Sequence, residues 1–577
     1  MTQIKNVENT IENIVSNGEK LTPVELNGDV GTNLAPISKY REALPQCCAV
    51  AAKNLVLITF GSTLGFSTIL IPELQSKNSE IPATTEEITW ISSLNLFLVP
   101  LGCFVSGPIS QYLGRKRTMM IANIPFIMAW LTFHYSYNTT MLFIALAMTG
   151  LTGGLIEAPV MTYVAEVTQP RLRGMLSATS TMSVILGVFT QMLGGSLTNW
   201  RTVAMVNLTY PLICFIALLM VPESPHWLAG KNRILFTLYI IKSFESIKCR
   251  LIHLMLSFNY TFILFDIDSL YFKNLIDALA KGRTKEAEKA LCWLRGWVSP
   301  AHVKTEFIGL CDIVKKPVET TSDKENLWKF YKKKTCYVPF ILVTTAFFIG
   351  AFGGTSILQT FAVVIFEEMS APIDKYTAAV FLGIAELVGT MTCVSTIHFT
   401  GKRLLTFFSL AGIGSSLLLA VIYGYLNDNQ IIHGENYTWI PMTLMIAAAF
   451  LSHIGIRLLP WILAGEVFPV KVRSSATGVA GSIGYIFMSI ANKTFLYMKA
   501  SMSLSGTLFF YALINFVGGI VLYYILPETE GRTLREIEEH YAGVQNLKDR
   551  PKKEELPFKE KWAATNPTAI YDDESKL

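Results

Sequence analysis

The chain contains the same charged sequence twice, a glutamate followed seven positions later by an arginine: Glu166 with Arg173, and Glu466 with Arg473. Each copy closes a long apolar run, and the other charged sequences near them also recur in a fixed order. A carboxylate at the end of an apolar helix is costly in hydrocarbon unless it finds a cation. The predicted chemistry is therefore ion pairing at helix ends, repeated in the two halves of the chain.

The expected partners are charged residues close to the ends of apolar runs: Glu166 with Arg115, Glu466 with Arg403, Arg173 with Glu223, and Arg473 with Glu528. Such pairs would hold helix ends together in one conformation and separate in another, and so bias a two-state equilibrium. Static ion pairs that fix the registry of the helices are the alternative interpretation.

Three further charges, Glu157, Glu386 and Arg457, lie well inside apolar runs. An ionisable group at such depth is expensive unless it is paired or hydrated, and it marks a functional site by default. We expect Arg457 to pair with Glu157 or Glu386 across a cavity, and one of these acids to contact the substrate or a proton. A buried ion pair that holds the two halves together is the other interpretation.

The elements that must position these charges are membrane helices. Of the 577 residues, 51% are hydrophobic and only 16% are charged, a composition typical of membrane proteins. Apolar stretches of about 18 residues or more can cross the hydrocarbon, and twelve such stretches are found near 50–72, 89–109, 118–136, 141–163, 176–197, 203–221, 337–362, 376–397, 404–426, 440–463, 475–497 and 505–526. The sequence predicts an all-α membrane protein with an internal repeat, the pattern of a transporter.

Charge in the connections predicts the orientation. The polar amino terminus lacks the features of a secretory signal, and basic residues concentrate in the connections 110–117, 164–175, 398–403 and 464–474. The positive-inside rule places these connections and both termini in the cytosol of a multi-pass plasma-membrane protein. The glycosylation sequons at Asn138 and Asn436 then lie outside, although chance sequons are as good an interpretation.

Other function classes find little support. The nine cysteines show no metal-ligand or redox spacing, so no metal is expected. The chain has no Walker A or dinucleotide sequence, so neither ATP-driven pumping nor a cofactor is predicted. An enzyme activity is not expected either, because no nucleophile and base or metal cluster recurs at one membrane depth. A net charge of +5 indicates contact with anionic lipid rather than nucleic acid.

Seven motifs in order resemble those of the sugar porters of the major facilitator superfamily, most closely the insect facilitated trehalose transporters. They lie within residues 50–228 and 279–541, at 107–116, 159–174, 222–228, 291–296, 460–473, 493–495 and 527–534. The resemblance implies a monomeric uniporter that carries trehalose or a hexose by alternating access. It also implies two pseudo-symmetric six-helix halves, with the boundaries 1–48 for the amino-terminal tail, 49–222 for the first half, 223–335 for a cytosolic helical linker, 336–527 for the second half and 528–577 for the carboxy-terminal tail.

The resemblance implies a substrate site as well. Trp461 matches the tryptophan that covers the sugar, and it can stack on an apolar pyranose face. The paired glutamines of the seventh span are replaced within residues 350–356, where Thr355, Ser356 and nearby Gln359 are possible substitutes. Gln191 lies near the polar position of the fifth span, and the polar pair of the eleventh span falls near Phe487 and Met488. These departures predict a cavity more apolar than a typical hexose site.

The coupling mode and the function have alternatives. Residues 65–67 read Gly-Phe-Ser where proton symporters of the family carry an acid, which favours facilitated diffusion, although Glu157 or Glu386 could restore coupling. The other candidate functions are a proton-coupled or organic-ion porter and a non-transporting nutrient sensor.

Residues 229–279 have no counterpart in the motif pattern. Residues 232–277 lack Gly, Ala, Pro and Val, as expected from translated AT-rich DNA, and we interpret the segment as a retained intron. An interfacial helix or disordered insert is the alternative, because a single additional span would invert the second half.

Overall fold

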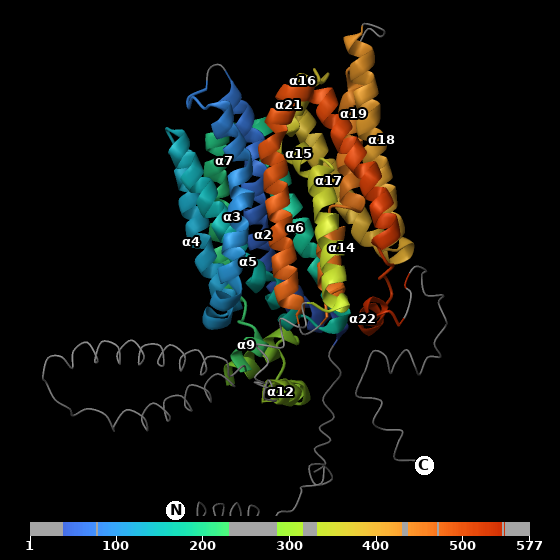
Figure 1. Cartoon of the computed structure of the whole chain (residues 1–577). Coiled ribbons are helices and arrows are strands. Elements are labelled where there is room, and N and C mark those ends of the chain that lie inside the picture. Colours follow the sequence, from blue (N-terminus) through green and yellow to red (C-terminus); the bar gives the residue numbers. More distant parts are fainter. Residues whose placement is uncertain are drawn as a thin grey trace, which may run out of the picture.

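The computed structural model describes residues 38–76, 79–229, 285–315, 332–429, 437–469, 472–532, 534–544 and 547. Within these ranges the chain is almost entirely helical, and the long helices stand side by side in one elongated bundle (Figure 1). Residues 230–279 of the predicted insertion and the sequon residue Asn436 lie outside the described residues.

The first group of long helices, which we call the amino-terminal bundle, consists of α2 (Lys39–Gln75), α3 (Thr85–Leu113), α4 (Arg115–His134), α5 (Thr139–Val167), α6 (Pro170–Leu197), α7 (Trp200–Asn207) and α8 (Thr209–Met220). At the start of several of these helices, a side chain accepts a hydrogen bond from a backbone N–H group of the first turn. Thr84 and Glu87 form a capping box at α3, and the Asn138 side chain accepts a hydrogen bond from the Met141 N–H at α5.

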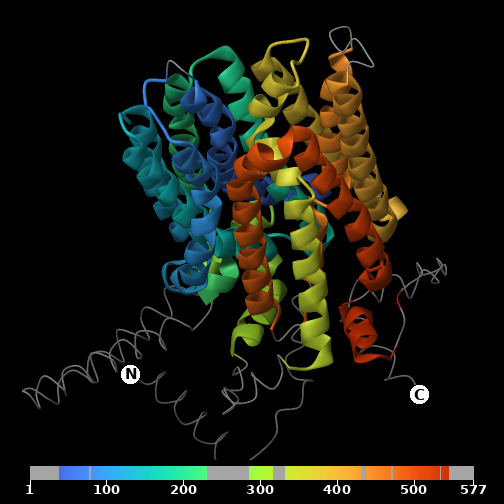
Figure 2. The same cartoon turned by 45° about the horizontal axis from the view of Figure 1, so that its top comes forward.

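The second group, the carboxy-terminal bundle, consists of α14 (Lys334–Phe352), α15 (Thr355–Thr360), α16 (Ala362–Glu368), α17 (Lys375–Thr400), α18 (Lys402–Asp428), α19 (Trp439–Ile454), α20 (Leu459–Glu466) and α21 (Arg473–Ile525). The last of these is broken at Met502 and Ser503, where the φ of Ser503 is +64°. Figure 2 shows the two parts of α21 joined at this break, with α14 between them.

Ten stretches of the described residues are long and apolar enough to cross a membrane. They include α21 as one stretch, although it folds back at Met502 and Ser503. They do not include α4, which begins with three basic residues. A many-helix membrane fold is thus confirmed, whereas the count of twelve spans stays a prediction.

Short helices gather at one end of the bundle, which we call the linker end; the opposite end is the far end. The short helices are α9 (Pro225–Ala229), a helix over 285–294, α12 (Pro300–Lys315) and α22 (Leu534–Ala542) (Figure 1). Arg295 ties this layer together, since its guanidinium binds the Glu306 carboxylate and donates to the Val167 carbonyl at the end of α5.

Small residues allow neighbouring helices to approach closely, as is usual where lipid supplies no hydrophobic drive. A Cβ atom added to Gly61 of α2 would lie 2.0 Å from the Val184 carbonyl oxygen of α6. One added to Gly154 of α5 would lie 2.0 Å from the Val99 carbonyl oxygen of α3. Direct backbone contact therefore fixes these helix pairs within the amino-terminal bundle.

The two bundles meet through α3 with α21 and α6 with α17. Polar contacts cross between them near the far end. The Asn492 amide donates to the Ser92 carbonyl at 3.1 Å, the Thr68 hydroxyl donates to the Gln359 carbonyl at 2.8 Å, and the Tyr376 hydroxyl donates to the Glu73 carboxylate at 2.7 Å. We call these the far-end contacts. They join the two bundles on that side.

Candidate functional site

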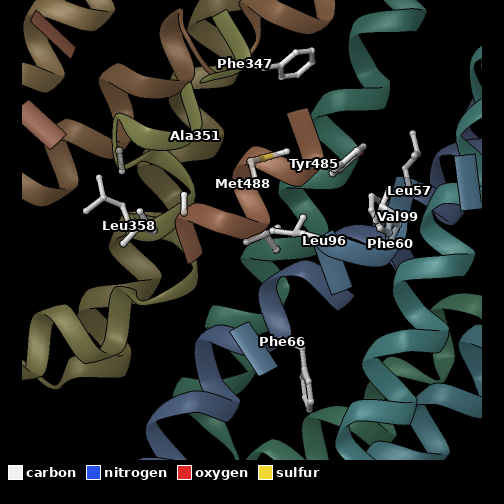
Figure 3. Packing of buried hydrophobic residues seen from close by; sticks show 14 of the residues in the cluster. Leu57, Phe60, Phe66, Leu96, Val99, Phe347, Ala351, Leu358, Tyr485 and Met488 are labelled. Atoms are coloured by element: carbon white, nitrogen blue, oxygen red, sulfur yellow. The ribbon is translucent and has the colours of Figure 1, made fainter. Parts of the chain in front are cut away.

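A cavity lies between the two bundles, on the linker side of the far-end contacts. It comprises about 1440 Å³, including space that is open to solvent, and α2, α3, α5 and α6 form one wall while α14, α15, α20 and α21 form the other. Figure 3 shows Phe60 and Leu96 of the first wall in the same region of the core as Tyr485 and Met488 of the second. Both halves of the repeat therefore contribute to one site.

Trp461, the residue that the sequence suggested for stacking on a sugar, lines this cavity from α20. Its ring is held by two other aromatic rings, Phe347 at 4.9 Å edge-on and Tyr485 at 5.5 Å between centroids. Gly481 leaves room behind it, since an added Cβ would lie 3.2 Å from the indole. The indole is thus fixed in position and partly exposed, as a stacking surface must be.

Gln359 connects two of the three deep charges. Its amide nitrogen donates to the Glu386 carboxylate at 3.1 Å, and its amide oxygen accepts from the Arg457 guanidinium at 3.1 Å. The chemistry fixes this amide orientation, because a carboxylate only accepts and a guanidinium only donates. Arg457 therefore reaches Glu386 through Gln359 rather than by the direct ion pair predicted from the sequence.

A break between α19 and α20 carries Arg457 into the cavity. Gly455 lies at this break, where an added Cβ would be 2.6 Å from the Ser409 Cβ of α18. The Ser409 hydroxyl satisfies the interrupted backbone, because it donates to the Leu451 carbonyl and accepts from the Ile456 N–H. Non-helical backbone at this depth is tolerated only where it is buried in protein or lines a cavity, and here it does both.

Glu157 lines the opposite wall from α5, inside a continuous helix. Tyr485 lies within electrostatic reach of both Glu157 and Arg457. The cavity therefore holds an acid from one bundle and a base from the other. Glu386 itself is buried behind Gln359 and is not among the lining residues.

The remaining predicted substrate residues divide into two groups. Thr355 and Ser356 line the cavity; the Thr355 hydroxyl donates to the Gly350 carbonyl, and the Ser356 hydroxyl donates to the Asn492 amide oxygen at 3.0 Å. Gln191 does not line it. Its amide exchanges two hydrogen bonds with Asn207 of α7, at 2.8 and 3.0 Å.

Two functional candidates were missed by the sequence reasoning. Asn492 lines the cavity one helical turn beyond Met488, where the polar position of that span was sought. Lys53 of α2 is fully buried and donates to the Ser180 hydroxyl, which lines the cavity. In the sequence, both residues could have been recognised as polar side chains inside apolar runs: Asn492 as a carboxamide and Lys53 as an amine.

The first helix-end cluster lies at the linker end of the amino-terminal bundle. The Arg115 guanidinium makes two parallel hydrogen bonds to the Glu166 carboxylate, at 2.9 and 3.1 Å, and the Ser224 hydroxyl donates to the same carboxylate. The predicted pairing of Arg115 with Glu166 is present. A bidentate, charge-assisted pair of this kind is among the stronger polar contacts in proteins.

The second helix-end cluster occupies the same place in the carboxy-terminal bundle, with one correction. Glu466 pairs with Lys402 at 2.8 Å rather than with the predicted Arg403, and the Thr529 hydroxyl also donates to Glu466 at 2.9 Å. Lys402 contacts a second carboxylate, that of Glu530, at 3.0 Å. Arg403 points elsewhere, donating to the Tyr523 carbonyl at 2.7 Å.

Glu223 and Glu528 each cap the start of a helix. Glu223 accepts the backbone N–H groups of Lys116 and Arg117 at the start of α4, and Glu528 accepts those of Lys402 and Arg403 at the start of α18. Unpaired N–H groups at a helix start favour an anion. Gly114 and Gly401 directly precede α4 and α18. Their φ angles of +106° and +83° lie in a region that residues with a Cβ atom rarely adopt, so both positions favour glycine.

The roles of two predicted gating residues and of one sequon stay predictions. The side chains of Arg173 and Arg473 lie outside the part of the chain that the structure describes. Asn138 lies at the far end as the helix cap of α5, and its use as a glycosylation site stays a prediction.

Known transporters resemble this chain over most of its length. The family model described as "Sugar (and other) transporter" matches residues 52–243 and 278–541. The facilitated trehalose transporter Tret1 of Bombyx mori is 24% identical over 535 residues, which are 92% of this chain and 94% of that protein. Its counterpart from Apis mellifera ligustica is 23% identical over 555 residues, covering 94% and 99%.

Solved structures show the same fold. The inward open conformation of the xylose transporter XylE from E. coli has a TM-score of 0.62 at 16% identity, covering 85% of this chain and 98% of that one. A partially occluded inward open conformation of the same transporter gives 0.60 at 15% identity, covering 84% and 99%. With most of its length matched by the family model, this chain belongs to the sugar transporter family.

Proposed function

We propose that this protein is a uniporter that carries a sugar, trehalose or a hexose, across the plasma membrane by alternating access. One observation carries the proposal: a cavity between two bundles that presents an aromatic-backed Trp461 beside polar side chains. Family membership and the trehalose transporters among its relatives support the same substrate class. Proton coupling is not favoured, since residues 65–67 lack an acid.

The proposed architecture has twelve spans in two six-helix halves. Besides the ten stretches identified, α4 and the second part of α21 supply the other two. The linker end is assigned to the cytosol with both termini, because it carries the basic connections. The described conformation then faces the cytosol, since the far-end contacts close the other side.

We assign each helix-end cluster the role of keeping its own half rigid. Both clusters join residues of one bundle only, so each half can rock as a unit. Arg173 and Arg473 remain proposed as gating residues, with Glu223 and Glu528 as their partners. The protein is proposed to act as a monomer in contact with anionic lipid and without nucleic acid.

Uptake by purified full-length protein in liposomes tests the proposal, with labelled trehalose and glucose as probes. We expect saturable uptake and counterflow that do not depend on a proton gradient. Trp461→Ala should reduce uptake roughly fivefold to a hundredfold, as the loss of about 1–3 kcal/mol of stacking implies, whereas Trp461→Phe should retain a large part of the uptake. Absence of sugar counterflow in protein that is folded and correctly inserted would contradict the proposal.

A further inference from the structure

The charge inside the cavity bears on what kind of sugar the protein carries. Among the lining residues, the titratable side chains are Glu157, Arg457 and Tyr485. A neutral sugar needs none of these charges, because hydroxyl groups are bound by uncharged donors and acceptors. The charges require an account of their own, since each is expensive at this depth.

The acid and the base differ in how they can avoid that cost. A buried carboxyl group can lose its charge by taking up a proton, whereas a guanidinium keeps its charge in proteins. The persistent charge in the cavity is therefore the cation on Arg457. Its nearest carboxylate, Glu386, is separated from it by the Gln359 amide.

The guanidinium of Arg457 has donors to offer a ligand. Five N–H groups project from it in a fixed plane. One nitrogen donates to the Gln359 amide oxygen, and a second approaches the Met488 sulfur at 3.7 Å, which is a weak acceptor. Gln359 thus holds the guanidinium in place while leaving donors on a residue that lines the cavity.

We propose that the solute preferred by this cavity among sugars is a sugar acid, whose carboxylate binds Arg457 while Trp461 stacks on its ring. The proposal rests on the proposed sugar transport and names its substrate class. A planar guanidinium matches a carboxylate in two parallel hydrogen bonds. Trp461 and Arg457 both line the cavity from the α19–α20 region, and Thr355, Ser356 and Asn492 provide hydroxyl and amide partners for the sugar hydroxyls.

Glu157 on the facing wall would complete the orientation of such a ligand. Its carboxyl group can bind ring hydroxyls, and it comes from the other bundle. A ligand with hydroxyls at one end and a carboxylate at the other therefore contacts both halves at once. Contact with both halves is what a substrate must make in order to favour the occluded state.

Three probes with the same ring test the charge: D-glucuronate, D-glucose and D-glucosamine, which carry negative, neutral and positive groups. Dissociation constants are measured by calorimetry on the full chain in detergent, and counterflow is measured in liposomes. We expect glucuronate to bind roughly tenfold to a hundredfold more tightly than glucose, the ratio for a hydrogen-bonded charged group. Equal or tighter binding of glucose, or a preference for glucosamine, would overturn the proposal.

Two variants assign the preference to Arg457. Arg457→Gln should abolish the preference for glucuronate while glucose binding is kept, and Arg457→Lys, which retains the charge, should keep part of it. Glu386→Gln can still accept the Gln359 hydrogen bond, and it should strengthen glucuronate binding because it removes the competing negative charge. A weaker glucuronate affinity in Glu386→Gln would count against the proposal even if Arg457→Gln does not fold.

A matched control removes a cation elsewhere. Lys375→Gln breaks an exposed ion pair with Glu367, outside the cavity, and should leave all three affinities unchanged. The outcomes separate this proposal from the transport proposal. If neutral sugars are carried and glucuronate does not compete, only the sugar-acid proposal fails; if no sugar is carried, the transport proposal fails.

Discussion

The two bundles use the same Gly-x4-Pro spacing to build opposite walls of the cavity, with different results. In α5, the segment from Gly154 to Pro159 stays helical and carries Glu157. In the second bundle, the segment from Gly455 to Pro460 breaks between α19 and α20 and carries Arg457. One spacing thus supplies an acid on a rigid helix and a base on an irregular turn.

A serine from a neighbouring helix makes both arrangements possible. In the amino-terminal bundle, Ser106 of α3 donates to the Leu155 carbonyl at 2.6 Å, the carbonyl that Pro159 cannot satisfy. In the carboxy-terminal bundle, Ser409 of α18 donates to the Leu451 carbonyl at 2.7 Å, in the last turn of α19 before the break at Gly455. The comparison teaches that each bundle satisfies its interrupted backbone with one serine hydroxyl, although the carbonyl and the helix that supplies the serine differ, as do the side chains that face the cavity.

The largest expected effect comes from the helix-end clusters, where the two bundles should differ in degree. Glu166→Gln leaves Arg115 without its carboxylate, and a lost hydrogen bond to a charged group costs about 1.5–3 kcal/mol. We expect transport per inserted molecule to fall more than tenfold. Glu466→Gln should lose less transport activity, because Lys402 still has a second carboxylate partner, Glu530, at 3.0 Å. Liposome counterflow measures both.

The double variant Glu466→Gln with Glu530→Gln is the control for that difference. It leaves Lys402 without either carboxylate and should lower transport as far as Glu166→Gln does. If Glu466→Gln alone lowers transport more than Glu166→Gln or the double variant does, Glu530 does not compensate for the loss of Glu466, and the explanation is wrong.

Alanine at the two glycines tests how tightly each wall is packed. Gly154→Ala places a methyl group against the Val99 backbone oxygen, and Gly455→Ala places one against the Ser409 side chain. Overpacking typically costs about 1–3 kcal/mol. The larger value is expected for Gly154→Ala, because its added Cβ would lie 2.0 Å from a backbone oxygen, whereas that of Gly455→Ala would lie 2.6 Å from the Ser409 Cβ and 2.9 Å from the Leu405 backbone oxygen. Melting temperature in detergent is the measurement. Gly465→Ala is the matched control, since nothing lies within 4 Å of its added Cβ.

The smallest effect concerns the two serines. Ser106→Ala and Ser409→Ala each remove a hydroxyl that both donates to a carbonyl and accepts from a backbone N–H. We expect each to destabilise the fold by about 1–2 kcal/mol, by similar amounts. Ser395→Ala, on the exposed side of α17, should have no measurable effect. Clearly unequal losses of stability in Ser106→Ala and Ser409→Ala would show that the two serines do not stabilise their bundles to the same degree.

Much of the fold could be predicted because apolar length and repeated charge are visible in a sequence. The helix-end clusters followed from the cost of a carboxylate in hydrocarbon, which demands a cation nearby. The choice of Lys402 over Arg403 did not follow. Neighbouring residues on a helix point about 100° apart, so the rotation of α18 decides which of them faces Glu466, and no local pattern fixes that rotation.

The cavity was harder to predict for a related reason. Gln359 was selected as a substitute sugar ligand, yet its amide is engaged between Glu386 and Arg457, three residues far apart in the sequence. Gln191 was selected by its position in a span, but the fold turns it toward Asn207. Asn492 was overlooked by one helical turn. Which way a side chain points depends on tertiary packing, which one sequence does not reveal.

Gln359 also connects the cavity with the contacts at the far end. Its side chain belongs to the cavity, but its backbone carbonyl accepts the hydrogen bond of Thr68 from the other bundle. One residue therefore joins the side chain that holds Arg457 to a contact between the two bundles at the far end. In the proposed transport cycle, a movement of α15 that breaks the contact with Thr68 would also shift the amide that holds Arg457, so opening of the far end and release of the guanidinium would be coupled.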